Sequence, residues 1–278
     1  MVPPSLFAGL VDDAALFPPG NAPMPRALHE HAIHRSARYA DVVGPLLCPA
    51  SRVDEMCAAL AGDQAVRLAI VFDVTGDGAH HALRSATADQ RVTLVAVEAA
   101  HARLGDDAAA VGANLARLPD VTGYLEVAPA DGDAALDVIS TSGWHAAKYR
   151  TGGTTAQAYP SAVELATFLV AVTARAIPFK LTAGLHRAVR HTSVDTGTEA
   201  HGVLNALVAT RVAQQGGDVV EVAAVLAERR PEALVAFVEE WDDGTCADVR
   251  RAFRSFGCCG VTDPIDDLVA LGVLEAGA

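Results

Sequence analysis

The chain has 278 residues, of which 51 % are hydrophobic, so it is long enough and apolar enough to bury a sizeable core. Its formal net charge of −13 argues against binding to the phosphate backbone of DNA or RNA. We find no apolar run long enough to cross a membrane, and residues 1–5 lack the basic and apolar regions of a signal peptide. Five cysteines without metal-like spacing are typical of a cytoplasmic protein.

Short apolar runs alternate with helix-like segments along the chain. We expect strands at residues 7–11, 42–48, 66–72, 92–97, 123–125 and 249–256, with two more that end at Lys148 and Lys180. We expect helices at residues 25–39, 76–87, 106–118, 133–140, 161–174, 201–215, 219–229, 231–240 and 262–271. Ser51 is the expected N-cap of a further helix, and Thr262 that of the last one. Residues 186–199 are polar, which predicts a long loop.

Eight strands that alternate with helices predict an α/β fold, a (β/α)8 barrel formed by one domain over residues 1–278. The helices expected at about residues 218–245 form an insertion before the last strand. A doubly wound open sheet is the alternative architecture. The sequence contains neither a Gly-x-Gly-x-x-Gly fingerprint after the first strand nor a Gly-Lys-Ser/Thr phosphate loop, so no nucleotide site is indicated.

The two lysines are the most informative residues of the sequence. Of 21 basic residues, only Lys148 and Lys180 are lysines, and each ends an apolar run in the form Lys-x-x-x-Gly. A mutational bias toward arginine explains why lysines are scarce, but not why the remaining two lie at two successive strand ends. Arginine stays charged, whereas a buried lysine can lose its proton and act as a nucleophile. These positions therefore favour a chemical role for lysine.

Ionisable and polar residues stand where the expected strands end. In a barrel, the carboxyl ends of the strands carry the chemistry. The candidates at these ends are Asp12, Asp13, Cys48, Asp73, Glu98, Glu126, Lys148, Arg150, Lys180, Thr182 and Ser255. Each acid taken singly also fits a helix cap or a surface charge. Together with the lysines, Glu126, Glu98 and Asp13 are the predicted catalytic residues, with one of the acids moving the proton.

The spacing of the two lysine segments predicts how they work. If both lysines point inward, their ammonium groups repel by roughly 3 kcal/mol at ~5 Å and a dielectric of about 20, which lowers the pKa of one lysine toward neutrality. A neutral amine forms a Schiff base with a carbonyl compound. Arg150 and the backbone N–H groups after each lysine are expected to hold a phosphate or carboxylate. The predicted substrate-binding residues are Arg150, Thr151, Gly152, Gly153, Thr182, Gly184, His186, Asp12 and Ser255.

The paired Lys-x-x-x-Gly strand ends resemble the class I aldolases of the deoxyribose-phosphate aldolase type. In that family the lysines lie on neighbouring late strands of a (β/α)8 barrel, so the resemblance implies that Lys148 forms the imine and Lys180 tunes its pKa. The insertion and the start around residues 12–19 are not features of that family. The segments Lys-x-Arg-Thr-Gly-Gly and Phe-Lys-x-Thr-Ala-Gly-Leu-His also resemble a bacterial group of barrel-like proteins to which we attach no activity.

Two other functions remain open. In a metal-assisted lyase or hydrolase, the lysines would be anion clamps, with His186, His191 or His201 and the acids Asp12, Asp13 or Glu126 as ligands. No His-x-His or His-Glu-x-x-His motif supports this alternative, and we expect no metal and no cofactor. In the other alternative, the chain is a non-catalytic protein that keeps the barrel fold. The expected partner is a small anionic carbonyl compound, not nucleic acid or membrane, with a homo-oligomer left open.

Overall fold

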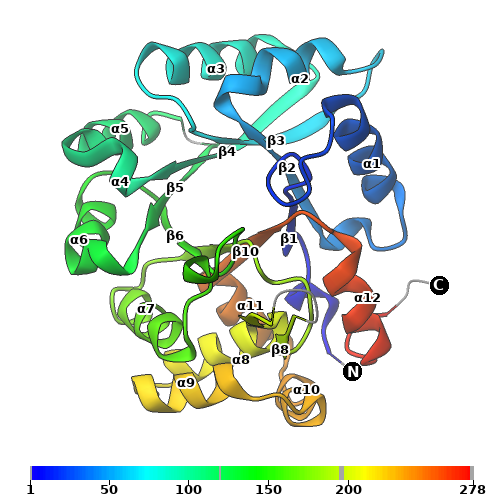
Figure 1. Ribbon diagram of the computed structural model, residues 1–278, viewed down its shortest axis with the longest axis vertical. Helices are drawn as coiled ribbons and strands as arrows, with labels where there is room; N and C mark the ends of the chain where they lie inside the picture. The colour runs from blue at the N-terminus through cyan, green and yellow to red at the C-terminus, as the bar shows by residue number, and fades with distance from the viewer. Residues whose placement is uncertain (1, 119, 194–196, 276–278) are drawn as a thin grey trace.

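The computed structural model describes residues 2–118, 120–193 and 197–275. Eight parallel strands close a barrel in the order β1-β10-β7-β6-β5-β4-β3-β2 (Figure 1). The strands are β1 (Val11–Asp13), β2 (Val43–Pro49), β3 (Val66–Val71), β4 (Val92–Ala100), β5 (Thr122–Val127), β6 (Ala146–Arg150), β7 (Phe179–Thr182) and β10 (Phe253–Cys258). The predicted (β/α)8 barrel is confirmed, and the open-sheet alternative is wrong.

Helices form a ring around the barrel, as Figure 1 shows. The ring contains α1 (Met24–Ser36), α2 (Val53–Ala59), α3 (Asp77–Ala88), α4 (His101–Leu104), α5 (Ala108–Leu115), α6 (Gly132–Thr141), α7 (Ala162–Ala174) and α12 (Thr262–Ala270). The core lies between strands and helices because successive strand side chains point to opposite faces. Phe179 of β7 shows this arrangement, since it stacks on Phe253 of β10 at 5.1 Å and meets Phe168 of α7 edge-on.

A helical insertion separates β7 from the last strand, as expected. It contains a small hairpin of β8 (His191–Thr192) and β9 (Glu199–Ala200), followed by α8 (Val203–Gln214), α9 (Val219–Ala227), α10 (Pro231–Glu239) and α11 (Asp243–Ala252). The hairpin replaces part of the predicted loop 186–199, of which residues 194–196 lie outside the described residues. The strand predicted at 249–256 is wrong in its first half, because α11, capped by Asp242, continues to Ala252.

Several boundaries also differ from the sequence-based expectation. Ser51 does not cap α2; its hydroxyl and backbone N–H both bind the Asp73 carboxylate instead. Thr262 begins α12 without a side-chain cap. β4 continues two residues past Glu98, and β1 contains only Val11 of the run predicted at 7–11. The helix predicted at 106–118 is shorter, since α5 follows a 3-10 turn at Gly105–Asp107.

The barrel interior is lined by small residues where large apolar ones are usual. Inward positions on β3, β4 and β6 hold Ala69, Ala96 and Ala146, in a cluster with Leu47 and Tyr124. Bulky branched side chains normally fill such layers. The alanines leave space for longer charged side chains from the same strands. The interior is therefore built to hold a polar group of residues rather than a purely apolar core.

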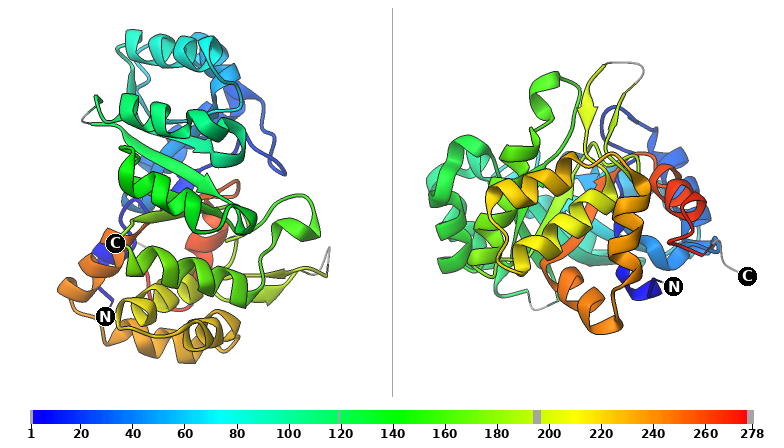
Figure 2. Two further views of the ribbon diagram at one scale, coloured as in Figure 1. Left: turned by 90° about the vertical axis from the view of Figure 1, so that its left-hand side faces the viewer. Right: turned by 90° about the horizontal axis from the view of Figure 1, so that it is seen from below.

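The two ends of the barrel are distinct. The strands run in parallel, so their carboxyl ends meet at one end, which we call the mouth, and their amino ends at the other, which we call the floor. In the right-hand view of Figure 2, the β8–β9 hairpin stands at the mouth end and the N-terminal turn η1 (Pro4–Leu6) at the floor end. Within the described residues, no helix has the length and apolarity needed to span a membrane.

Candidate functional site

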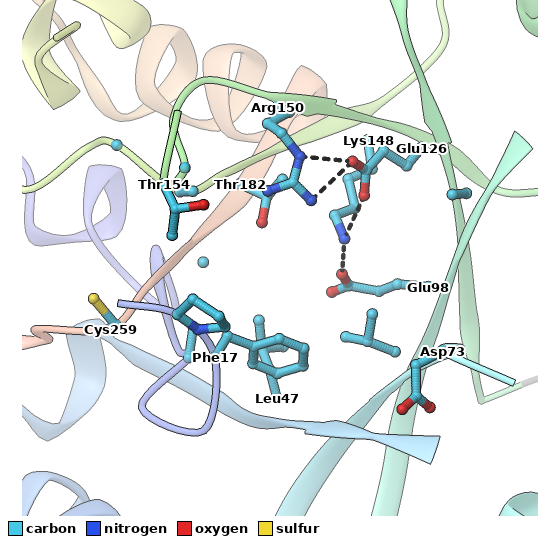
Figure 3. A pocket seen from close by; sticks show the side chains of 18 of the residues that line it. Phe17, Leu47, Asp73, Glu98, Glu126, Lys148, Arg150, Thr154, Thr182 and Cys259 are labelled. Atoms are coloured by element: carbon cyan, nitrogen blue, oxygen red, sulfur yellow. Dashed lines mark hydrogen bonds and ion pairs between the residues drawn. The ribbon is translucent and has the colours of Figure 1, made fainter. Parts of the chain in front are cut away.

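A chain of alternating charges crosses the inside of the barrel. The Lys180 ammonium donates hydrogen bonds to Asp12 Oδ2 and Glu98 Oε1, each at 2.5 Å. Lys148 Nζ lies 2.8 Å from Glu98 Oε2 and 2.9 Å from Glu126 Oε2. Glu126 then bonds the Arg150 guanidinium at 3.1 Å (Figure 3). Three carboxylates and three cations thus compensate one another.

Strand register explains why these residues meet. Lys148 pairs in register with Lys180 on the adjacent strand and with Glu126 on the other side, and all three point inward by strand alternation. Glu98 projects from β4 beside the inward Ala96, and Asp12 from β1, so both reach the lysines across the barrel. The prediction that the two lysines lie side by side on neighbouring strands is confirmed.

A cavity of about 390 Å³ opens at the mouth and reaches Lys148. This volume is in the range of small-molecule sites. Its charged lining is formed by Glu98, Glu126, Lys148, Arg150, Asp73 and Arg103, and its apolar lining includes Phe17, Leu47, Val71 and Phe72. Lys180 does not line this cavity. Its ammonium group lies deeper in the barrel, 5.2 Å from the centre of the Tyr124 ring. Only one of the two amines therefore meets the cavity.

The carboxylates between the lysines reverse the predicted electrostatics. Burial lowers a lysine pKa, but for Lys148 the attraction of Glu98 and Glu126 outweighs it, so the pKa of Lys148 is raised. The pKa of Lys180 is likewise raised, because Asp12 and Glu98 outweigh burial. The expectation of a lowered lysine pKa is wrong for this state of the site. It considered only the repulsion between the ammonium groups, without the acids that separate them.

The three acids respond differently to their surroundings. Burial alone would raise the pKa of Glu98, yet Lys148 and Lys180 together lower it to about 2. The pKa of Glu126 is also lowered, since Lys148 and Arg150 outweigh burial. For Asp12, burial outweighs Lys180, and the pKa is raised. Glu98 is thus a fixed anion between two cations, while Glu126 combines ionisation with contact to the cavity.

Two of the predicted acid positions lie away from the mouth. Asp13 was predicted as a catalytic acid at the end of the first strand, but alternation along β1 turns it to the outer side, where it bonds His31 Nδ1 at 2.9 Å and the backbone N–H of Ala15. Asp12 points inward but lies near the floor, where Ser255 donates to it at 2.8 Å. Asp12 and Ser255 therefore do not line the mouth cavity, and neither does Asp13.

The predicted turn residues divide between the cavity and the packing of two loops. Thr182, Gly153 and Gly184 line the cavity. Thr151 does not; its hydroxyl donates to the carbonyl of Ala183 and ties the loop after β6 to the loop after β7. At Gly152, a Cβ would lie 2.5 Å from Gly184 Cα. The glycine at 152 is thus required by this close approach rather than by a phosphate contact.

His186 lines the cavity as predicted, together with a cysteine that the sequence did not single out. His186 Nδ1 lies 2.9 Å from the Asp263 carboxylate, and Nε2 lies 3.7 Å from Cys259 Sγ. Hydrogen bonds with Cys258 and Cys259, and then Asp263, raise the pKa of His186. Nothing in the sequence spacing indicated this group, because His186 lies 73 residues before Cys259 and 77 residues before Asp263.

Other cavity residues were also missed. Phe17 belongs to the Pro-rich loop after β1, Tyr159 lies in the loop after β6, and Arg103 lies in α4, which follows β4. Asp73 was recognised as a strand end but was not chosen as a site residue. Its position after a continuous apolar run was the available signal.

The histidines considered as metal ligands are engaged elsewhere. His201 is buried, which lowers its pKa to about 4, and its Nε2 lies 2.9 Å from the carbonyl of Pro160. His191 Nδ1 lies 3.3 Å from the carbonyl of Val189. In the part of the chain that the structure describes, no group of three or more His, Cys, Asp or Glu side chains is arranged to hold a metal ion.

Comparisons of the chain with protein-family models, with curated proteins and with solved structures gave no match. A functional assignment therefore depends on the residues of the site and their geometry.

Proposed function

We propose that the protein is a Schiff-base enzyme, a carbon–carbon lyase of the aldolase kind, in which Lys148 forms an imine with a small anionic carbonyl compound. The observation that supports this most is the placement of Lys148. It is the lysine that lines the mouth cavity, and a carboxylate stands on either side of its ammonium group. We propose a cytoplasmic setting, in which the free thiols of all five cysteines would persist.

The contacts of the two lysines favour Lys148 over Lys180 as the nucleophile. Lys180 makes two short hydrogen bonds and is 1 % exposed. Lys148 makes close ion-pair contacts, but Glu98 Oε2 has no aligned hydrogen-bond donor among the described residues. A carbonyl group that enters the cavity therefore has to break weaker hydrogen bonds at Lys148 than it would at Lys180. Lys180 acts as a fixed cation that pairs with Asp12 and helps to hold Glu98 ionised.

Glu126 is the residue placed to move the proton. Its Oε2 lies 2.9 Å from Lys148 Nζ, and its side chain is 18 % exposed at the cavity. In the proposed sequence, Glu126 takes one proton from the Lys148 ammonium, and the neutral amine adds to the carbonyl carbon to give a carbinolamine. Glu126 then returns that proton to the departing hydroxyl, which leaves as water. The resulting iminium is paired with Glu98 and withdraws electrons from the bond that breaks.

The anionic end of the substrate would meet Arg150. Its guanidinium is half exposed at the cavity and, among the described residues, bonds one side chain, Glu126. Arg103 lines the same cavity, and its Nη1 donates a hydrogen bond to the backbone carbonyl of Asp73. Guanidinium groups bind carboxylates and phosphates with two parallel hydrogen bonds. The cavity can therefore hold a carbonyl group near Lys148 and an anion near its rim.

The raised lysine pKa values favour a second candidate. In this alternative, both lysines stay cationic and serve as clamps for an anionic substrate in a lyase or hydrolase reaction without an imine. The two candidates differ in what replacement of Lys148 by arginine does. A cation clamp accepts arginine in part, whereas imine formation requires a primary amine.

Borohydride trapping tests the proposal. The protein is incubated with sodium borohydride and a panel of small keto and aldehyde acids and phosphates, and its mass is measured. The expected result is one adduct on the natural protein with at least one compound and none on Lys148→Arg. Arg84→Lys places a lysine on the exposed face of α3 and is the control for non-specific labelling. Equal labelling of Lys148→Arg and the natural protein would contradict the proposal.

A further inference from the structure

A second cavity, of about 370 Å³, opens at the floor of the barrel. Its walls come from the first residues of several strands, among them Arg67 of β3, Tyr124 of β5 and Arg254 of β10. Arg250 of α11 and the turn after η1 complete the lining. The mouth cavity is lined by the opposite ends of the same strands, and the two cavities share no lining residue.

The floor cavity gathers three arginines that form no ion pair with a carboxylate in the part of the chain that the structure describes. More than half of the arginines in the chain form an ion pair with a carboxylate. Within the described ranges, Arg67, Arg250 and Arg254 have no such partner. The carboxylate in the lining, Asp12, is held by Lys180 and Ser255. In a protein of net charge −13, this cavity therefore carries a local excess of positive charge.

Arg250 is the arginine most deeply placed. Its Nη2 donates to the carbonyls of Ala8 and Arg254, while its Nη1 is buried without a hydrogen-bond partner in the described part of the chain. Burial lowers the pKa of Arg250 to about 10. A buried donor left without a partner costs about 1–3 kcal/mol, more when the group is charged. An anion in the cavity would pair with the guanidinium and relieve this cost.

We propose that the floor cavity binds a small, multiply charged anion that carries a phosphate group or several carboxylates. Three guanidiniums from three different elements surround the space. Arg67 and Arg254 can each donate two parallel hydrogen bonds to such a group, and Arg250 can donate from its unpartnered Nη1. The volume fits a small metabolite rather than a macromolecule. This site is independent of the imine chemistry proposed at the mouth, because it uses neither Lys148 nor Arg150.

Titration calorimetry at low ionic strength tests the site, with inorganic phosphate and citrate as separate probes. The variant Arg67→Gln/Arg254→Gln removes two cations that are exposed and bind no described side chain, so the fold is expected to persist. The control Arg84→Gln/Arg117→Gln removes the same charge from two exposed positions outside the cavity, one on α3 and one in the turn after α5. Arg150→Gln reports binding at the mouth. Comparison of the two probes distinguishes phosphate from carboxylate recognition.

The expected result is binding of at least one probe by the natural protein, weakened about tenfold or more in Arg67→Gln/Arg254→Gln and within about twofold in both other variants. Three results would overturn the proposal. These are no binding of either probe, equal weakening in the Arg84→Gln/Arg117→Gln control, and loss of binding in Arg150→Gln alone. A thermal shift of each variant with and without the probe confirms that the protein measured is folded. The proposed function at the mouth can fail without affecting any of these outcomes.

Discussion

Replacement of Lys180 by methionine tests the charge chain at its most buried point. Lys180 has two carboxylate partners, Asp12 and Glu98, each 2.5 Å from its ammonium, and all three side chains are less than 5 % exposed. Methionine keeps most of the volume but removes the cation. The variant Lys180→Met then holds two buried carboxylates without the charge that they share, and the network gains one net negative charge.

The expected cost at pH 7 is about 3–5 kcal/mol of unfolding free energy, which is typical when one partner of a buried ion pair is removed. The lowered pKa of Glu98 corresponds to a free energy of similar size. Its fall from 4.5 to about 2 corresponds to ~3 kcal/mol, contributed by both lysines. Because this pKa is lowered in the folded state, the stabilisation is present above pH 4.5 and is lost as the pH falls toward 2. In Lys180→Met the carboxylates can take up protons, so the penalty shrinks on acidification.

Urea unfolding followed by circular dichroism at pH 7 and pH 4 measures both effects. The double variant Lys180→Met/Asp12→Asn restores the charge balance and should recover a substantial part of the loss at pH 7. Arg84→Met, an exposed position on α3, should change stability by less than about 0.5 kcal/mol. A loss below about 1 kcal/mol in Lys180→Met at pH 7, or the same loss at both pH values, would refute the reasoning.

Three further predictions concern the mouth. Because the pKa of Lys148 is raised, its amine is protonated at neutral pH, and imine formation should accelerate as the pH rises toward the pKa of Lys148. A rate that is flat from pH 7 to 9 would favour the alternative in which the lysines only clamp an anion. Glu126→Gln should fold normally and lower turnover by about 10²-fold or more in steady-state assays, since it removes the proposed proton carrier. Cys259 should react with iodoacetamide faster than Cys57, which is partly buried to a similar extent, because the positively charged His186 ring lies 3.7 Å from the Cys259 sulfur, and His186→Gln should remove the difference on a peptide map.

The sequence was sufficient for the architecture and for the central pair of residues. Continuous apolar runs identified the strands because parallel strands in this fold are covered on one face by helices and on the other by the barrel interior. Two-residue alternation placed Lys148 and Arg150 on the inner face, and register between successive strands brought Lys148 beside Lys180. These features depend on local pattern and on neighbouring strands, which the chain order reveals.

Interactions across the barrel could not be predicted in the same way. Asp12 and Asp13 are adjacent acids, and alternation requires one to point inward and the other outward, but nothing local decides which. The contact of Glu98 with both lysines depends on where the closed barrel places β4 relative to β6 and β7. The sign of the lysine pKa shifts follows from these distant carboxylates. The expectation based on the lysines alone was therefore wrong.

The glycines and the last strand show two other limits of sequence reasoning. Gly152 lies in a Thr-Gly-Gly turn that suggested free backbone donors, whereas its small size allows the backbone of Gly184 to approach. The apolar residues of 249–256 fit a strand pattern, yet Val249 lies on the buried face of α11. A short apolar segment fits both a strand and one face of a helix, and the cap at Asp242 decides between them.

The most direct measurement for the central claim is the location of the borohydride-trapped adduct by tryptic peptide mapping. Because Lys148 and Lys180 are the only lysines, each lies in its own peptide between arginines. An imine reduced at Lys148 blocks cleavage there and gives a peptide that spans residues 118–150 and carries the added mass. We predict this peptide and an unmodified Lys180. An adduct at Lys180, or no adduct in a protein that turns over the same compound, would contradict the assignment of Lys148 as the nucleophile.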